Sequence, residues 1–178
     1  MWRDDPIYRA YLDIQIGKTL SYMDVLLNQR TWRLAQQWRQ VAPFLGALTL
    51  CVGCRHDREL NILNALGAQA VGIDLVATGR VIEMDMHDLK FPAESFDAVY
   101  SCHSLEHAYD LDRVLAEWRR VTKPGGVWVI EMPIQFKPSA TDRHDVRSIA
   151  GLQARLGRMQ TLWAGEGPTA LQYIGRLQ

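Results

Sequence analysis

Hydrophobic positions from residue 45 onward switch repeatedly between short continuous runs and helix-like spacing. Short apolar runs bounded by glycine or polar residues are typical of buried β-strands, and they fall at 47–52, 70–75, 96–101 and 127–131. Apolar residues three and four positions apart predict one helix that begins near Asp57, its expected N-cap, and a second that begins at Asp110. This alternation predicts an α/β, Rossmann-like, mostly parallel sheet with helices on both faces.

The segment between the second and third predicted strands is too short for the usual crossover helix. Only about half a dozen residues separate Asp74 from Val81, whereas a parallel crossover needs about a dozen or more. We therefore expect this helix to be missing and the third strand, near 81–84, to be short or missing at the sheet edge. Further along the chain we expect a turn at 123–126 and a helix at 146–156. Two final strands are expected at 160–164 and 171–176.

Residues 7–41 have helical periodicity and no strand-like runs. In the first predicted helix the apolar face is expected to hold Ile7, Tyr11, Leu12 and Ile14. A second helix contains Trp32, Ala35 and Trp38 at helical spacing, begins at Asn28 or Thr31 and ends at Pro43. The chain is therefore expected to divide into an N-terminal helical extension, 1–44, and a binding domain, 45–178.

Composition narrows the class of protein without naming a function. The chain has 178 residues, 48% of them hydrophobic and 22% charged, which are ordinary values for one globular domain. Twenty basic side chains balance 20 acidic ones, so no excess charge points to nucleic acid or to an anionic membrane. We found no apolar stretch of membrane-spanning length, no signal-peptide pattern and no disulfide framework among three cysteines. We expect a cytoplasmic protein without nucleic-acid or membrane partners, and homo-oligomers are possible.

Five segments in a fixed order carry the functional signal. Gly53-Cys54 follows the first predicted strand, and GIDL places Asp74 21 residues after Gly53. MDMHDLKFP, SFDAVYSCHSLEHAYD and EWRRVTKPGGVWVIEMP then follow. Together these segments resemble the class I S-adenosylmethionine (SAM)-dependent methyltransferases of the small-molecule type with LEH and KPGG segments, over about residues 45–133. The resemblance implies SAM as cofactor and methyl transfer to a small or medium-sized acceptor.

Ligands of such sheets bind outside the carboxyl ends of the strands, which is where the candidate cofactor residues fall. An acid after the second strand suits the two ribose hydroxyls, and the resemblance assigns this role to Asp74. It also implies that Asp85 accepts from the adenine amine and that Met86 lies on the adenine ring. The full set expected to contact the cofactor is Val52, Gly53, Cys54, Arg55, Asp74, Leu75, Asp85, Met86 and Ser101.

The first loop departs from the family pattern of an acid followed by three spaced glycines. Cys51 takes the place of the acid, Arg55 that of the second glycine and Asp57 that of the third. Arg55 either pairs with the methionine carboxylate of the cofactor or fills the pocket. The alternative function is therefore a catalytically inactive protein that serves as a ligand-binding or partner-binding subunit. A nicotinamide-dependent oxidoreductase would need a glycine-rich turn that this loop lacks.

Histidines and cysteines supply the remaining candidates for chemistry. His103 and His107 follow the fourth strand, and a histidine there suits proton removal from an acceptor near neutral pH. His103 is the better base candidate, and His107 has the alternative of packing against the next helix. His144 is a weaker candidate. Cys51 and Cys54 form a single CxxC near Cys102-His103, but a cysteine in an apolar strand behaves as a small hydrophobe, so no metal is expected.

Overall fold

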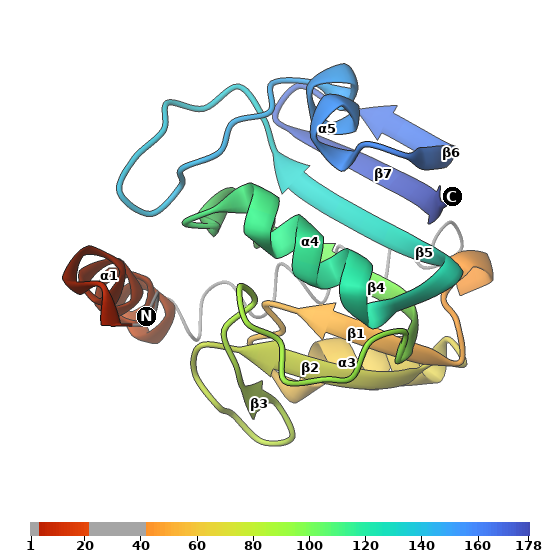
Figure 1. Cartoon of the computed structure of the whole chain (residues 1–178), viewed down its shortest axis with the longest axis horizontal. Coiled ribbons are helices and arrows are strands. Elements are labelled where there is room, and N and C mark those ends of the chain that lie inside the picture. Colours follow the sequence, from red (N-terminus) through yellow and green to blue (C-terminus); the bar gives the residue numbers. More distant parts are fainter. Residues whose placement is uncertain (1–3, 22–41) are drawn as a thin grey trace.

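A seven-stranded mixed sheet forms the centre of the computed structural model, which describes residues 4–21 and 42–178 (Figure 1). The strand order is β3-β2-β1-β4-β5-β7-β6. The first five strands in this order are parallel, and β7 is antiparallel to both β5 and β6. The strands are β1 Leu48–Val52, β2 Gln69–Asp74, β3 Ile82–Glu83, β4 Phe96–Cys102, β5 Thr122–Pro133, β6 Met159–Glu166 and β7 Ala170–Leu177. The Rossmann-like α/β prediction is confirmed.

Helices cover both faces of this sheet. α4 (Leu111–Val121) and α5 (Ile149–Leu156) lie on the face nearer the viewer in Figure 1, and α3 (Asp57–Ala65) lies behind β1 and β2. Short 3-10 turns, η2 (Ala42–Phe44) and η3 (Leu105–His107), precede β1 and follow β4. Two buried apolar clusters result, one between the sheet and α4 with α5, and one between the sheet and α3.

The larger cluster fixes α4 against the sheet. Trp118 of α4 and Trp128 of β5 are both fully buried, with their rings edge to face at a centroid distance of 5.5 Å. The indole of Trp128 donates to Thr122 Oγ1 at 3.0 Å, so its polar atom is satisfied inside the core. Asp110 caps α4 by accepting from the backbone N–H of Arg113 at 3.0 Å, as its sequence position predicts.

The connection from β2 to β3 contains no helix, as predicted from its length. β3 has two residues, lies at the sheet edge and pairs in parallel with the end of β2 through Ile73–Ile82 and Asp74–Glu83. Because this connection is short, residues 84–87 stay close to the end of β2. The backbone N–H of Met84 donates to the carbonyl of Asp74 at 2.8 Å.

Two local predictions were wrong. The N-cap of α3 is His56, whose Nδ1 accepts from the Arg58 N–H at 3.2 Å. Asp57 does not cap the helix because its carboxylate accepts instead from the backbone N–H of Arg80 at 2.7 Å. Residues 123–126 are not a free turn before a strand: they form an irregularity inside β5, where the pairing jumps from Thr122 to Val127 opposite Phe96 and Ala98.

The N-terminal helix α1 (Pro6–Ser21) lies beyond the carboxyl ends of the parallel strands (Figure 1). The predicted apolar face is wrong for Ile7 and Ile14, which are 68% and 48% exposed, whereas Tyr11 is buried and Leu12 is half-buried as expected. The buried residues are Tyr8, Tyr11, Gln15 and Thr19. This face is polar because α1 packs on strand ends and loops rather than on a hydrophobic core. The second N-terminal helix predicted from the sequence lies outside the described residues, and the domain boundary after residue 44 stays a prediction.

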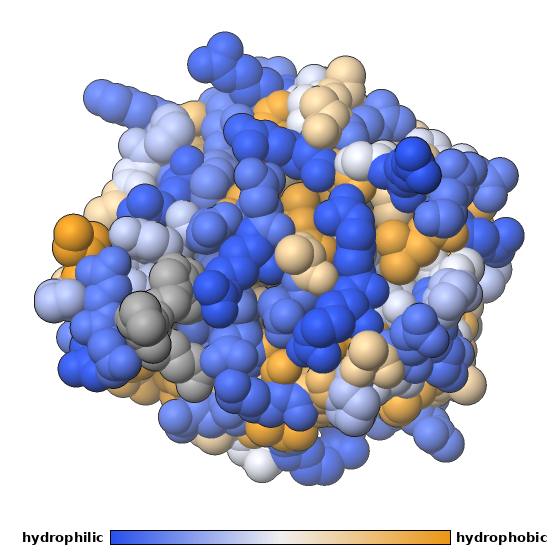
Figure 2. All heavy atoms as spheres, in the orientation of Figure 1, coloured by the Kyte–Doolittle hydropathy of each residue, from blue (hydrophilic) through white to orange (hydrophobic). Residues whose placement is uncertain are grey.

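Polar side chains dominate the face that α4 and α5 present to solvent, and apolar side chains appear there only in small separate groups (Figure 2). Within residues 4–21 and 42–178, no helix combines the length and the apolar character needed to cross a bilayer.

Candidate active site

An open cavity lies at the carboxyl ends of β1, β2 and β4, and four residues of α1 line it. Most of the residues predicted to form the site line it: Val52, Gly53, Arg55, Asp74, Leu75, Asp85, Met86, His103 and His107. Cys54 and Ser101 do not line it. Both are fully buried, Cys54 among apolar residues on the α3 side of the sheet and Ser101 within β4.

The strand register explains why these distant residues meet. Val52, the last residue of β1, is paired with Ile73 on one side and Ser101 on the other. The chain after β1 is tied to β2 by a hydrogen bond from the Cys54 N–H to the Ile73 carbonyl at 2.9 Å. The loops after β1, β2 and β4 therefore leave the sheet at one place, as parallel strands require.

Gly53 opens the first loop in a conformation that requires glycine. Its φ is +69°, and a Cβ at this position would lie 2.1 Å from Ser104 Oγ. Arg55 follows in the cavity wall with only 7% of its surface exposed, and its carbonyl accepts from Thr78 Oγ1 at 2.6 Å. Arg55 is therefore a buried part of the cavity wall.

Asp85 forms a buried hydrogen-bonded group with Tyr8 of α1 and with His87. Tyr8 Oη donates to Asp85 Oδ2 at 2.5 Å, and the backbone N–H and Nδ1 of His87 lie 2.9 and 2.7 Å from Oδ1. Burial raises the pKa of Asp85, but these hydrogen bonds outweigh it and hold the pKa below its usual value. The carboxylate is therefore charged.

His87 connects this group to α4. Its Nε2 accepts from the backbone N–H groups of Tyr109 and Asp110 at 3.0 and 3.3 Å. A neutral imidazole that accepts at Nε2 carries its proton on Nδ1, so Nδ1 donates to Asp85. Sequence reasoning missed His87, although its position two residues after Asp85 is a usable signal. Tyr8, 77 residues away from Asp85, had no such signal.

α1 is joined to the opposite rim of the cavity by further hydrogen bonds. Tyr11 Oη donates to the carbonyl of His107, and burial raises the pKa of Tyr11, so its hydroxyl stays protonated. Gln15 and Lys18 contact the 134–147 loop, at Thr141 O (2.8 Å) and at Asp142 Oδ2 (2.9 Å). Along its length α1 thus contacts the loop after β4 through Tyr11 and the loop after β5 through Gln15 and Lys18.

An aromatic group that sequence reasoning also missed supports α1. The rings of Tyr8 and Tyr11 lie 5.1 and 5.2 Å from the ring of Tyr109, centroid to centroid. The guanidinium of Arg143 lies over Tyr109, 4.7 Å from its centroid. These contacts join three segments that are distant in the sequence.

The two candidate bases have different surroundings. His107 Nδ1 lies 2.8 Å from the Thr141 carbonyl, so it donates and leaves the lone pair of the neutral ring on Nε2. Burial lowers the pKa of His107, although Glu106 and the Thr141 carbonyl oppose this, so the ring is neutral at neutral pH. His103 has a positive φ of 51°, and its Nε2 lies 3.1 Å from Glu131 Oε1. His144 does not line the cavity.

Comparison with known proteins finds a family match and related folds. Residues 50–130 match the family described as "Methyltransferase domain". The sterol 24-C-methyltransferase erg6 of Aspergillus fumigatus is 35% identical over 95 residues, which is 53% of this chain and 25% of the relative. The demethylmenaquinone methyltransferase of Geobacillus kaustophilus is 32% identical over 128 residues, which is 72% of this chain and 50% of the relative. The chain therefore spans at most half the length of these two curated relatives.

Solved structures with low sequence identity share the fold. The 1,6-didemethyltoxoflavin-N1-methyltransferase of Burkholderia thailandensis, with bound 1,6-didemethyltoxoflavin and S-adenosylhomocysteine, has a TM-score of 0.75 at 16% identity and covers 96% of this chain and 89% of its own. The [4+2]-cyclase SpnF has a TM-score of 0.64 at 17% identity, with 80% of each chain covered. At such identities the likeness is one of fold.

Proposed function

We propose that the chain transfers the methyl group of SAM to a small-molecule acceptor, because residues 50–130 match a methyltransferase domain and the fold is shared with a methyltransferase that binds S-adenosylhomocysteine. The observation that carries the proposal is the meeting of Gly53, Asp74 and the Asp85–Met86 pair in the wall of one cavity. These residues come from three separate loops, and each has the chemistry that one part of the cofactor needs. When bound, SAM supplies an electrophilic methyl group on a sulfonium.

Asp74 and Asp85 would hold the nucleoside part of the cofactor. Asp74, half-buried at the end of β2, would accept from both ribose hydroxyls through charge-assisted hydrogen bonds. A carboxylate offers about four acceptor sites. The two sites on Asp85 Oδ1 are used by His87, and Tyr8 uses one of the two on Oδ2. One site on Oδ2 remains for the adenine amine, beside Met86 in the cavity wall.

Arg55 would bind the carboxylate of the methionine part. Its guanidinium is always positively charged and can bind both oxygens of a carboxylate in a bidentate geometry. Its place in the wall next to Gly53 supports this role over that of a plug, because the cavity persists beside it. The arginine thus compensates for the glycines that this loop lacks.

His107 would remove the acceptor proton, and His103 would shape the acceptor side of the cavity. A neutral ring whose Nδ1 is held by the Thr141 carbonyl presents an unprotonated Nε2, which is the state a general base needs. The acceptor would enter beside Tyr11, Leu12 and Gln15, which line the cavity from α1. Because the relatives are sterol and demethylmenaquinone methyltransferases, lipophilic ring compounds are the choice for a first screen.

Calorimetry with S-adenosylhomocysteine tests the proposal first, because it needs no acceptor. We expect one saturable binding event per chain, followed in a second assay by transfer of labelled methyl from SAM to a member of a quinol and sterol panel. Absence of binding heat and of any thermal shift at millimolar S-adenosylhomocysteine would refute cofactor binding and with it the proposed activity.

A further inference from the structure

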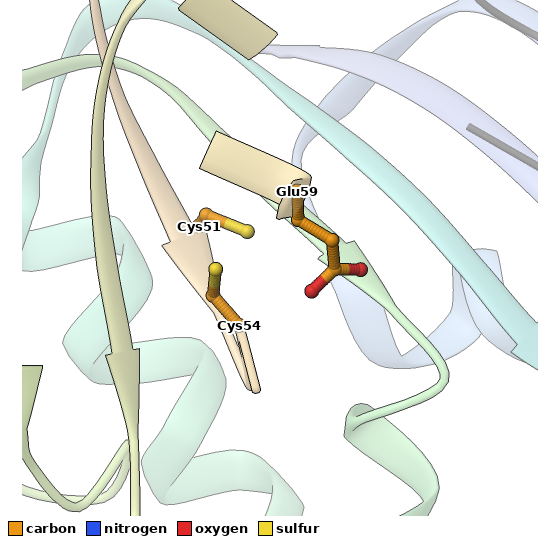
Figure 3. Close-up of side chains that lie close together, drawn as sticks. All are labelled: Cys51, Cys54 and Glu59. Carbon is orange, nitrogen blue, oxygen red and sulfur yellow. The ribbon is translucent and has the colours of Figure 1, made fainter. Parts of the chain in front are cut away.

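A cluster of sulfur and oxygen ligands is buried on the α3 side of the sheet, outside the candidate active site (Figure 3). Cys51 comes from β1, Cys54 from the loop after it and Glu59 from α3. Their ligand atoms all lie within 4.8 Å of one another, and the three residues are at most 2% exposed. Figure 3 shows the two sulfur atoms facing each other, with the carboxylate beside them.

The neighbouring strand leaves room for this cluster. Gly72 of β2 is the register partner of Cys51, and a Cβ at Gly72 would lie only 3.0 Å from Cys54 Sγ. The absence of a side chain at this position in a central strand therefore gives the Cys54 sulfur its space.

Tyr100 of β4 is the register partner of Cys51 on the other side. It is 2% exposed, and its hydroxyl has no hydrogen-bond partner among residues 4–21 and 42–178. A buried phenolic hydroxyl can donate one hydrogen bond, and a thiolate or a metal-bound carboxylate would accept it.

We propose that Cys51, Cys54 and Glu59 form a binding site for a thiophilic divalent cation, Zn²⁺ in the first place, with the Tyr100 hydroxyl as a supporting donor. Thiolate and carboxylate are both zinc ligands, and zinc with three protein ligands takes a water as its fourth. With Zn–S bonds of about 2.3 Å in a tetrahedron, two sulfurs lie about 3.8 Å apart. This is inside the 4.8 Å within which the ligand atoms lie.

Packing alone is the competing explanation, since buried cysteines often act as small hydrophobes. It accounts for each thiol separately. It gives no reason why a carboxylate should lie beside both thiols in the same buried cluster, because burying a carboxylate carries a cost. A bound cation accounts for the two thiols and the carboxylate together.

The bound metal would restrain the conformation of the first loop, residues 53–56. Cys51 and Cys54 flank Val52 and Gly53, which line the cavity on the other side of the same backbone. A metal joining β1, this loop and α3 would fix the loop where the sequence lacks two of the expected glycines. The site does not depend on the proposed methyl transfer, because the metal is held by side chains outside the cavity.

Metal binding by the full chain tests this proposal directly. The protein is purified under reducing conditions, stripped of metal and titrated with Zn²⁺, and with Co²⁺ to observe the thiolate charge-transfer absorption. We expect about one Zn²⁺ per chain. Cys54→Ser and Glu59→Gln should lose or weaken binding, whereas Cys102→Ser should bind as the wild type does, because the Cys102 sulfur lies in a separate group with His103 and Glu131.

Two further measurements keep the result decisive. Tyr100→Phe should weaken binding by about 10- to 100-fold, as expected for loss of a supporting hydrogen bond. Circular dichroism of each variant identifies any that fail to fold. If Cys54→Ser does not fold, the Zn²⁺ affinities of Glu59→Gln and Tyr100→Phe test the proposal instead. Absence of cobalt–thiolate absorption in the folded wild type would overturn the proposal. So would a metal lost in Cys102→Ser but kept in Cys54→Ser.

Discussion

The two sides of the candidate active site are built in different ways. The cofactor side, defined here as residues 52–55, 74–75 and 85–86, consists of loops that leave neighbouring parallel strands at the same edge. The acceptor side, defined as α1, residues 103–107 and the 134–147 loop, depends on contacts between residues far apart in the chain. Tyr11 and His107 are 96 positions apart, and Gln15 and Thr141 are 126. Strand order suffices to assemble the first side, whereas the second exists only when α1 is docked.

Replacing His107 is the sharpest way to separate the two sides. Loss of a general base typically costs about 10²- to 10⁴-fold in rate. We expect His107→Ala to lower kcat by this order with an acceptor found in the screen, while S-adenosylhomocysteine binds unchanged. His144→Ala is the matched control, because His144 does not line the cavity. Equal activity in the two variants would remove His107 from the proposed mechanism.

Replacing Asp74 should have the converse effect on the cofactor side. Losing charge-assisted hydrogen bonds to the ribose should cost about 2–4 kcal/mol, or roughly 30- to 1000-fold in Kd. Calorimetry with S-adenosylhomocysteine measures this for Asp74→Ala against Asp112→Ala, whose side chain is 76% exposed on α4. If both variants bind as tightly as the wild type, the ribose does not lie at the end of β2.

Tyr8 joins the two sides, so its hydroxyl should contribute to stability as well as to docking of α1. A hydrogen bond to a charged group contributes about 1.5–3 kcal/mol. We expect Tyr8→Phe to lower the free energy of unfolding in urea by this amount, because Tyr8 is fully buried against the charged Asp85. Tyr173→Phe is the control, since that hydroxyl makes its hydrogen bond with the neutral Thr161 at 3.1 Å. An equal loss of unfolding free energy in the two variants would show that the hydrogen bond to Asp85 stabilises the fold no more than a neutral one does.

The acceptor side should also make stability depend on pH. Burial lowers the pKa of His107 and of His144 below the usual 6.5. Between that value and the lower native pKa values, the unfolded chain binds more protons than the native protein, so stability falls as the pH falls below 6.5. The slope is at most about 1.4 kcal/mol per pH unit for each histidine. Urea unfolding at a series of pH values should show a smaller slope for His107→Gln, and an unchanged slope would contradict this assignment.

The smallest expected effect concerns the ion pair at the end of α1. Lys18 and Asp142 are partly exposed, at 26% and 33% of their side chains, and such pairs contribute about 0–1 kcal/mol. Lys18→Ala should therefore change the free energy of unfolding by less than Tyr8→Phe does, and the change should shrink further in high salt. A larger loss than that of Tyr8→Phe would mean that α1 is held mainly by its C-terminal end.

The sequence was sufficient where local pattern and strand order determine the structure. Apolar runs located the main strands, the short Asp74–Val81 interval predicted the missing helix, and a helix was correctly predicted to begin at Asp110. Sequence reasoning failed where a side chain chooses between local and distant partners. Asp57 pairs with Arg80 instead of capping α3, and the buried face of α1 is polar because it covers strand ends. Tyr8 and Arg143 could not be predicted, since the docking of α1 brings Tyr8 to Asp85 and the packing of the 134–147 loop brings Arg143 to Tyr109.

A crystal structure of the chain with S-adenosylhomocysteine tests the central claim most directly. We predict that both ribose hydroxyls lie within hydrogen-bond distance of the Asp74 carboxylate, that the adenine rests beside Met86, and that Arg55 meets the methionine carboxylate. A ligand bound elsewhere, or a ribose that faces away from Asp74 while Arg55 occupies the cavity, would contradict the account.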